Sequence, residues 1–220
     1  MPGDHLRDIR IMIEGGVKVK RVIVGVDFLS FFTKDMTRKD KLLRYPYPIT
    51  IKDHYEFYKL YLLNIPQKGL IERNIGDYRK NRQEPIGNGS IVMKEQDEFI
   101  DNNPTAHIRK RKFRIPASIF RNPQDFSDGL RYLGELISFL KEHNIDYVLF
   151  INPTQSATYL TLNLEAYVDL LRGMSEITSF FDFSGLNSVC INNMNFMESS
   201  HFRKRTGDMI VKRIDRKSVV

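Results

Sequence analysis

The sequence is poor in residues that cross-link or anchor a chain: it has one cysteine, no tryptophan and no long apolar run. Because Cys190 is alone, an internal disulfide and a thiolate metal cluster are both excluded. We predict that Cys190 is a small buried residue, the commonest fate of a lone cysteine. No stretch reaches the roughly 20 apolar residues of a membrane span, and the N-terminus has no signal-peptide pattern. As written, the chain is expected to be cytoplasmic, without a membrane segment.

The composition otherwise indicates a folded, soluble and basic protein. Of its 220 residues, 41% are hydrophobic and 28% are charged, which is typical of one globular domain. Lysine and arginine number 34 against 27 acidic residues, which gives a net charge of +7. Much of the excess falls in two basic runs, 107–114 and 203–217, which we interpret first as solvated surface. Nucleic acid is not expected as a partner, because no nucleic-acid-binding motif accompanies the runs.

Apolar patterning predicts alternating helices and buried strands. Continuous β-branched runs bounded by turn residues are typical of strands covered on both faces of a parallel sheet. Apolar residues spaced three and four apart predict helices between them. The alternation favours an α/β fold. The expected strands are 20–27, 147–151 and 179–183, and the expected helices are 4–15, 125–143, 163–177 and 206–214.

Residues 33–124 interrupt this rhythm. They include an aromatic-rich helical pattern at 51–63 and loop-like stretches at 85–90 and 102–104. We interpret the chain as a single incomplete α/β domain over residues 1–220, with a helical insertion or lid at about 33–124.

One of the five histidines has an acidic residue three positions before it, in Glu198-Ser199-Ser200-His201. A catalytic serine needs an imidazole to accept its proton, and the imidazole needs a carboxylate to orient it. The spacing lets such a pair form locally. A capping or surface role is one alternative, and half of a di-iron site is another, although the second Glu-x-x-His of that site is absent. We predict neither a bound metal nor a cofactor.

Three segments near the C-terminus resemble the end of SGNH (GDSL-like) serine hydrolases. They are 180–188 (Phe-Phe-Asp-Phe-Ser-Gly-Leu-Asn-Ser), 195–202 and 207–210. In that superfamily an Asp-x-x-His motif precedes a helix that packs on the sheet. The most similar members are extracytoplasmic and DltD-like, related to enzymes that acylate cell-wall polymers and polysaccharides. Residues 22–28 and 150–154 also resemble the strand ends of this group.

The resemblance implies a role for each matching residue. His201 would be the general base and Glu198, in place of the usual Asp, its orienting acid. Asp27 and Asn152 would lie at the edge of the site, because each follows the carboxyl end of a strand. The oxyanion-binding Asn of the family's Gly-x-Asn-Asp motif is not evident in Gly25-Val26-Asp27.

The nucleophilic serine has no counterpart in this pattern, since the family carries it after the first strand, upstream of all these segments. Gly3-Asp4-His5 imitates the motif in letters only, and Ser30, Ser199 and Ser200 lack the strand-to-helix context. We therefore expect an SGNH-like acyl-ester hydrolase or O-acyltransferase fragment, inactive alone, with an acylated polysaccharide or cell-wall polymer as substrate. The alternative is a non-catalytic remnant that binds an anionic polymer through its basic patches.

Absence of the upstream segment would also affect the sheet. In the flavodoxin-like order 2-1-3-4-5, strand 20–27 would be the third strand, with an exposed apolar edge where the first belongs. Exposed edges pair with other chains, so we expect self-association through this edge. An extracytoplasmic or membrane-anchored location would likewise require an N-terminal segment that the sequence does not contain.

Overall fold

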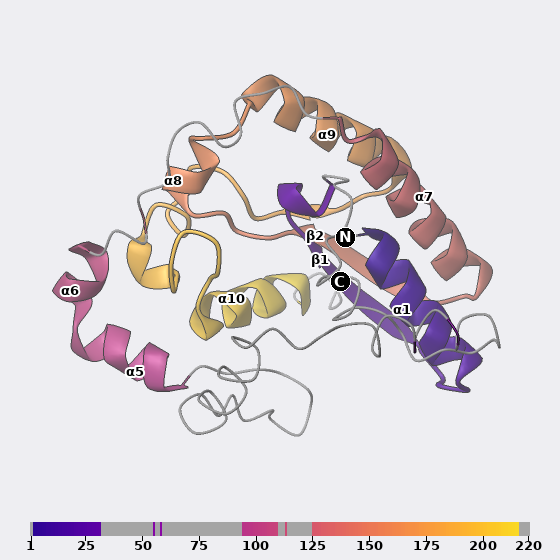
Figure 1. Ribbon diagram of the computed structural model, residues 1–220, viewed down its shortest axis with the longest axis horizontal. Coiled ribbons are helices and arrows are strands. Elements are labelled where there is room, and N and C mark those ends of the chain that lie inside the picture. Colours follow the sequence, from indigo (N-terminus) through magenta and orange to yellow (C-terminus); the bar gives the residue numbers. More distant parts are fainter. Residues whose placement is uncertain are drawn as a thin grey trace. The chain divides into compact units, whose positions relative to one another are not determined.

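The computed structural model of the chain describes residues 2–31, 55, 58, 94–109, 113 and 125–215. The chain divides into two compact units, Met1–Thr33 with Lys94–Val220, and Lys34–Met93. Of the second unit only Tyr55 and Tyr58 are described, both helical and exposed, so the rest of the helix predicted at 51–63 lies outside the described residues. The helices and strands labelled in Figure 1 all belong to the first unit.

A three-stranded parallel sheet forms the framework of this unit (Figure 1). Its strands, in spatial order, are β1 (Arg21–Val26), β2 (Asp146–Ile151) and β3 (Phe181–Asp182). β1 and β2 pair over their full length, whereas β3 is shorter than the strand predicted at 179–183. With helices flanking this sheet, the structure confirms the predicted α/β fold class.

The main core lies between one face of the sheet and three helices. α1 (Pro2–Glu14), α7 (Ser127–Glu142) and α9 (Leu164–Ile177) each bury one apolar face, and α7 contacts both of the others. All three agree with the predicted helices to within two residues at each end. Side chains alternate along a strand, so the paired strands present one apolar face to this core. The buried strand residues are Val24, Val26, Leu149 and Ile151.

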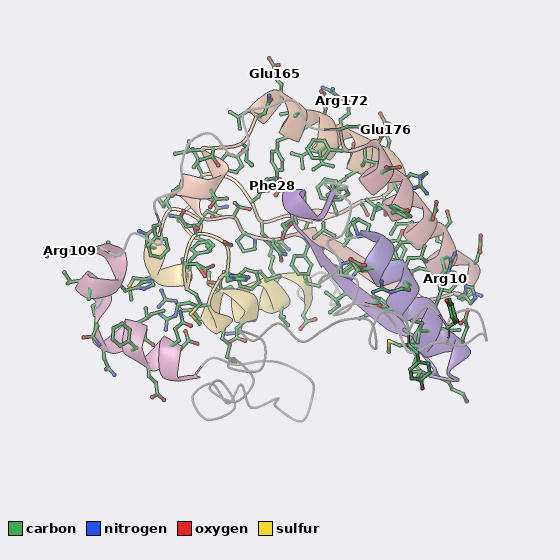
Figure 2. All side chains as sticks on the ribbon, viewed as in Figure 1. Arg10, Phe28, Arg109, Glu165, Arg172 and Glu176 are labelled. Atoms are coloured by element: carbon green, nitrogen blue, oxygen red, sulfur yellow. The ribbon has the colours of Figure 1, made fainter. Side chains whose placement is uncertain are left out.

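The segment after β1 is held tightly against the core. There the 3₁₀ turn η1 (Phe28–Phe31) touches α7 at Gly129, where a Cβ atom would lie only 2.8 Å from both Cα and the carbonyl oxygen of Phe31. The ring of Phe28, labelled in Figure 2, meets the ring of Tyr167 on α9 edge-on, with centroids 6.5 Å apart. The chain leaving the carboxyl end of β1 therefore has a fixed path.

The other elements contact the long connection after β3, form part of it, or follow it. They are α5 (Lys94–Asn102), α6 (Pro104–Arg109), α8 (Ser156–Tyr159), η3 (Asn193–Asn195) and α10 (Lys204–Asp215). The helix predicted at 206–214 is thus found as α10, whereas α5, α6 and α8 were not predicted. Among the described residues, no helix combines the length and apolarity needed to cross a membrane.

Candidate active site

The predicted acid–base pair lies on a tight turn that we call the histidine turn (residues 195–203). Its two arms form an antiparallel bridge between Phe196 and Phe202. The backbone N–H of Met197 donates to the carbonyl oxygen of His201 at 2.8 Å, and that of Arg203 donates to Asn195 at 2.8 Å. The bridge leaves residues 198–201 at the tip, where the side chain of His201 is more exposed to solvent than that of Glu198.

A single carboxylate oxygen organises the tip of the histidine turn. Oε1 of Glu198 accepts hydrogen bonds from Nδ1 of His201 at 2.7 Å, from the backbone N–H of His201 at 2.8 Å, and from that of Ser200 at 3.2 Å. Since a carboxylate only accepts, Nδ1 of the neutral imidazole carries the proton and Nε2 carries the free lone pair. Nε2 has no hydrogen-bond partner among the described residues. The His201 side chain is 79% exposed and that of Glu198 is 30% exposed.

The histidine turn and the chain before it are tied to the segment that leaves β2. The Thr158 hydroxyl donates to the carbonyl oxygen of Ser199 at 2.6 Å. Further back, Nε2 of Gln155 donates to Oδ1 of Asn193 at 2.8 Å, and the backbone N–H of Ser156 donates to the carbonyl of Cys190 at 3.0 Å. These contacts connect Glu198 and His201 to the carboxyl end of the sheet, the edge at which α/β folds bind ligands.

The two other predicted site residues lie at that same edge, each directly after its strand. Asn152 extends the ladder by donating its backbone N–H to the carbonyl oxygen of Val26 at 2.7 Å, which places it beside Asp27 in the pairing. The Asn152 side chain lies over Gly25, where a Cβ atom would be 3.3 Å from its Oδ1. The structure therefore brings Asp27 and Asn152 to neighbouring strand ends, but the hydrogen bonds of Asn152 do not extend to His201.

A polar network at the end of β3 was not predicted as part of the site. The Ser184 hydroxyl donates to Oδ1 of Asp182 at 2.6 Å, so the Tyr167 hydroxyl, 2.6 Å from the same serine oxygen, must donate to Ser184. Burial raises the pKa of Tyr167, which keeps it a neutral donor. The sequence signal was an Asp and a Ser two positions apart at a strand end. Because Ser184 is committed to Asp182, its hydroxyl is not bound to the His201 imidazole.

Most of the described cations in the two basic runs are exposed, in agreement with their interpretation as solvated surface: Arg109, Lys204, Arg205, Lys212 and Arg213. The first residue of each run is buried instead. Arg203, at the start of one run, is 2% exposed and forms ion pairs with Asp97 and Asp101. His107, at the start of the other, is 1% exposed, and its Nε2 donates to the carbonyl oxygen of Phe196 at 2.9 Å. Arg203 ties the histidine turn to α5, and His107 ties it to α6, a role that their places in charged runs did not reveal.

Cys190 is buried, as predicted, and its thiol donates to the carbonyl oxygen of Phe183. Burial raises the pKa of this thiol, which is the opposite of what a catalytic thiolate requires. Of the serines considered at the sequence level, Ser199 and Ser200 lie between Glu198 and His201 at the tip, and the side chain of Ser30 lies outside the described residues. In the described part of the chain no cluster of His, Cys, Asp or Glu is suited to hold a metal ion.

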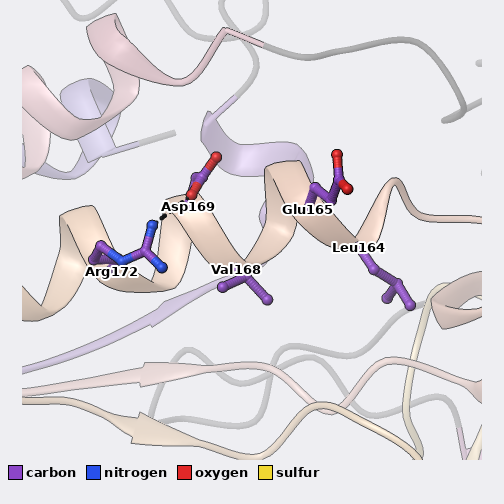
Figure 3. Close-up of a pocket in the computed structure, with 5 residues that line it drawn as sticks. All are labelled: Leu164, Glu165, Val168, Asp169 and Arg172. Atoms are coloured by element: carbon purple, nitrogen blue, oxygen red, sulfur yellow. Dashed lines mark hydrogen bonds and ion pairs between the residues drawn. The ribbon is translucent and has the colours of Figure 1, made fainter.

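A surface depression of about 470 Å³ lies along α9 (Figure 3). It is lined by Leu164, Glu165, Val168, Asp169 and Arg172, and none of the predicted site residues contributes to it. Its charged pair, Arg172 and Asp169, is a surface ion pair at 2.7 Å within one helix. The depression therefore does not serve the candidate site.

Comparisons with known proteins identify no relative. No model of a known protein family matches the chain. Neither a curated protein nor a solved structure matches it.

Proposed function

We propose that the chain supplies the general base of an SGNH-like acyl-ester hydrolase or O-acyltransferase, with a flavodoxin-like arrangement of its sheet. The observation that carries the proposal is the hydrogen bond between Nδ1 of His201 and Oε1 of Glu198, with Nε2 left available. The pair lies on a turn tied to the carboxyl end of a parallel sheet, where α/β enzymes gather their catalytic residues. An acylated polysaccharide or cell-wall polymer is the proposed substrate class.

The proposed reaction uses the pair as a proton acceptor and donor. A serine hydroxyl attacks the ester carbonyl carbon and loses its proton to Nε2 of His201, while the nearby Glu198 carboxylate stabilises the imidazolium. The same proton then passes to the departing alkoxide, which leaves an acyl-serine. Water or an acceptor hydroxyl, deprotonated by Nε2, completes hydrolysis or transfer. The family resemblance expects this serine on a strand-to-helix turn preceding β1, and no described serine hydroxyl bonds to the imidazole.

Exposure favours this role for His201 over a structural one. A histidine that only stabilises the fold gains little from a side chain that is 79% exposed. The orienting acid, by contrast, is more covered and is fixed by two backbone N–H groups besides the imidazole. A general base needs this combination. Nε2 must be able to reach the substrate, while the hydrogen bond made by Nδ1 holds the ring in one tautomer.

Ester turnover by the protein purified from its natural source tests the proposal. Acetyl and longer acyl esters are assayed with wild type, His201→Asn, Glu198→Gln and, as a matched control, His143→Asn. His143 is also exposed and also bonds through Nδ1, to the carbonyl oxygen of Phe139, but it lies at the end of α7. Loss of the base should lower kcat by about 10²–10⁴-fold in His201→Asn, with a smaller loss in Glu198→Gln.

The control His143→Asn should retain wild-type turnover. Equal turnover in His201→Asn and wild type would remove His201 from the role of base. Absence of turnover in the natural protein with every ester would overturn the acyl-transfer function itself.

A further inference from the structure

We infer that Arg203 is a positioning residue for His201, acting as a clamp between the histidine turn and α5. The inference rests on the proposed function of His201 as a base. Arg203 lies two residues after His201 in the chain, and its side chain points back into the protein while that of His201 faces solvent.

The guanidinium of Arg203 uses all five of its N–H groups. Nε donates to a carboxylate oxygen of Asp97, and Nη1 and Nη2 donate to the two carboxylate oxygens of Asp101 at 2.9 and 2.8 Å. The remaining two donate to the carbonyl oxygens of Met194 at 3.2 Å and Asp97 at 3.1 Å. With a side chain only 3% exposed, this is a buried cation neutralised by two acids from one helix. The planar fork of arginine fits this set of acceptors, and a lysine ammonium does not.

Both arms of the histidine turn are held by the same pair of short helices. Arg203 fixes the C-terminal arm to α5, and its backbone N–H also closes the base of the turn on Asn195. His107, on α6, fixes the N-terminal arm through the carbonyl oxygen of Phe196. The carbonyl of Asn195 accepts a second bond, from the Thr206 hydroxyl at 3.0 Å. The base of the turn is therefore rigid although its tip is exposed.

An exposed imidazole has little packing of its own to set its place. Apart from its bond to Glu198, the position of His201 depends on the path of the backbone, which the clamp fixes. A displacement of about 1 Å at a reacting group can cost on the order of 10²-fold in rate. Arg203 therefore influences proton transfer although it touches neither the imidazole nor the substrate.

Nuclear magnetic resonance of the full chain labelled with ¹⁵N-histidine tests this positioning without any substrate. Wild type should show His201 as the neutral tautomer protonated at Nδ1. Arg203→Lys keeps the charge but loses the fork, so the His201 signals should broaden or move toward a mixture of tautomers. Lys204→Met is the matched control, because Lys204 follows Arg203 in the chain but forms only an exposed ion pair, with Asp208 on α10. It should leave the His201 signals unchanged.

A milder variant guards against loss of the fold. Asp101 is 57% exposed on its side chain, so Asp101→Asn keeps the size of the partner and removes only its charge. It should shift the His201 signals in the same direction by a smaller amount, with an unchanged circular dichroism spectrum. Wild-type His201 signals in both folded variants, or in Asp101→Asn if Arg203→Lys does not fold, would overturn the inference.

Kinetics separate this inference from the proposed function. In the natural protein, Arg203→Lys should lower kcat for esters by about 10–100-fold with little change in KM, because the base is misplaced while substrate binding is kept. If the tautomer signal responds to Arg203 but the natural protein cleaves no ester, the proposed chemistry fails and the clamp remains. If turnover depends on His201 but neither kcat nor the signals depend on Arg203, the clamp fails and the chemistry remains.

Discussion

Position 198 holds a glutamate where the family that the sequence resembles has the aspartate of an Asp-x-x-His motif, and the structure shows what the longer side chain does. Its longer side chain folds back so that one oxygen meets the backbone N–H groups two and three residues ahead, and the imidazole as well. A hydrogen bond to a carboxylate is stronger than one between neutral groups, so three on one oxygen define the tip well. The extra methylene is thus compatible with the orienting role proposed for Glu198 within a turn of this shape.

The salt-bridged carboxylate of Asp101 gives a prediction for acid stability. The hydrogen bond from Arg203 is the main cause that lowers the pKa of Asp101 below 3.8. A carboxyl group with a depressed folded pKa stabilises the protein above its unfolded pKa, and that contribution disappears as the pH falls through the folded value. Wild type should therefore exceed Asp101→Asn in urea-unfolding free energy at pH 6, and the difference should shrink below about pH 4.

Exposure of Asp101 to solvent keeps the expected difference small. Asp208, which pairs with Lys204 in the open on α10, provides the control substitution Asp208→Asn. A gap between wild type and Asp101→Asn that stayed constant from pH 6 to pH 2.5 would contradict the assigned ion pair.

At the scale of elements, α7 contains two glycines with opposite expected responses to alanine. Gly129 faces the backbone of Phe31 at 2.8 Å, and backbone cannot move aside as a side-chain tip can, so Gly129→Ala should destabilise by about 1–3 kcal/mol. Gly134 on the same helix has nothing within 4 Å of its missing Cβ, so Gly134→Ala should stabilise by about 0.5–1 kcal/mol. Urea-unfolding midpoints of the two variants measure both effects. The reverse order of stability would show that η1 does not pack on α7 as described.

Elements with strong internal patterns could be predicted from the sequence, and those that depend on distant partners could not. β1, β2, α7 and α9 were predicted to within about two residues, because the strands are continuous apolar runs and the helices have apolar residues spaced three and four apart. α5, with sequence KEQDEFIDN, has only two neighbouring apolar residues, so its pattern is weak. The buried Arg203 packs against this helix, and no local pattern contains that contact.

The same distinction applies to the candidate site. Glu198 and His201 are three residues apart, so their pairing is local and could be anticipated from spacing. The partners of Arg203 lie 102 and 106 positions earlier in the chain. In a basic run, an arginine predicts solvated surface, and only the fold reveals that two acids meet it in the interior. The proximity of Asn152 to β1 followed from the rule that parallel strands end at one edge.

At the scale of the whole molecule, β1 is an edge strand within the described residues, since its ladder there involves only β2. Ile23, near its middle, is 52% exposed. Apolar edges of this kind associate with other chains unless charge or covering prevents it. Sedimentation velocity should therefore show association that grows with protein concentration, and Ile23→Lys should weaken it.

A matched substitution distinguishes association through the edge of β1 from nonspecific association through exposed apolar side chains. Ile108, on α6, is 49% exposed, so Ile108→Lys removes a similar apolar surface far from β1 in the chain. It should leave association unchanged. A monomer at all concentrations, or equal effects of the two substitutions, would exclude this sheet edge as the site of association.

Glu198 and His201 make different contacts in the histidine turn, so the two positions should accept substitutions differently during evolution. Glu198 closes the turn through two backbone bonds, so a lineage kept only for its fold would still retain an acceptor there. The His201 side chain, four-fifths exposed and bonded only to Glu198 within the described residues, would in that lineage be replaced freely. Persistence of the histidine across descendants would therefore record selection for chemistry, whereas persistence of the glutamate alone would record only selection for shape.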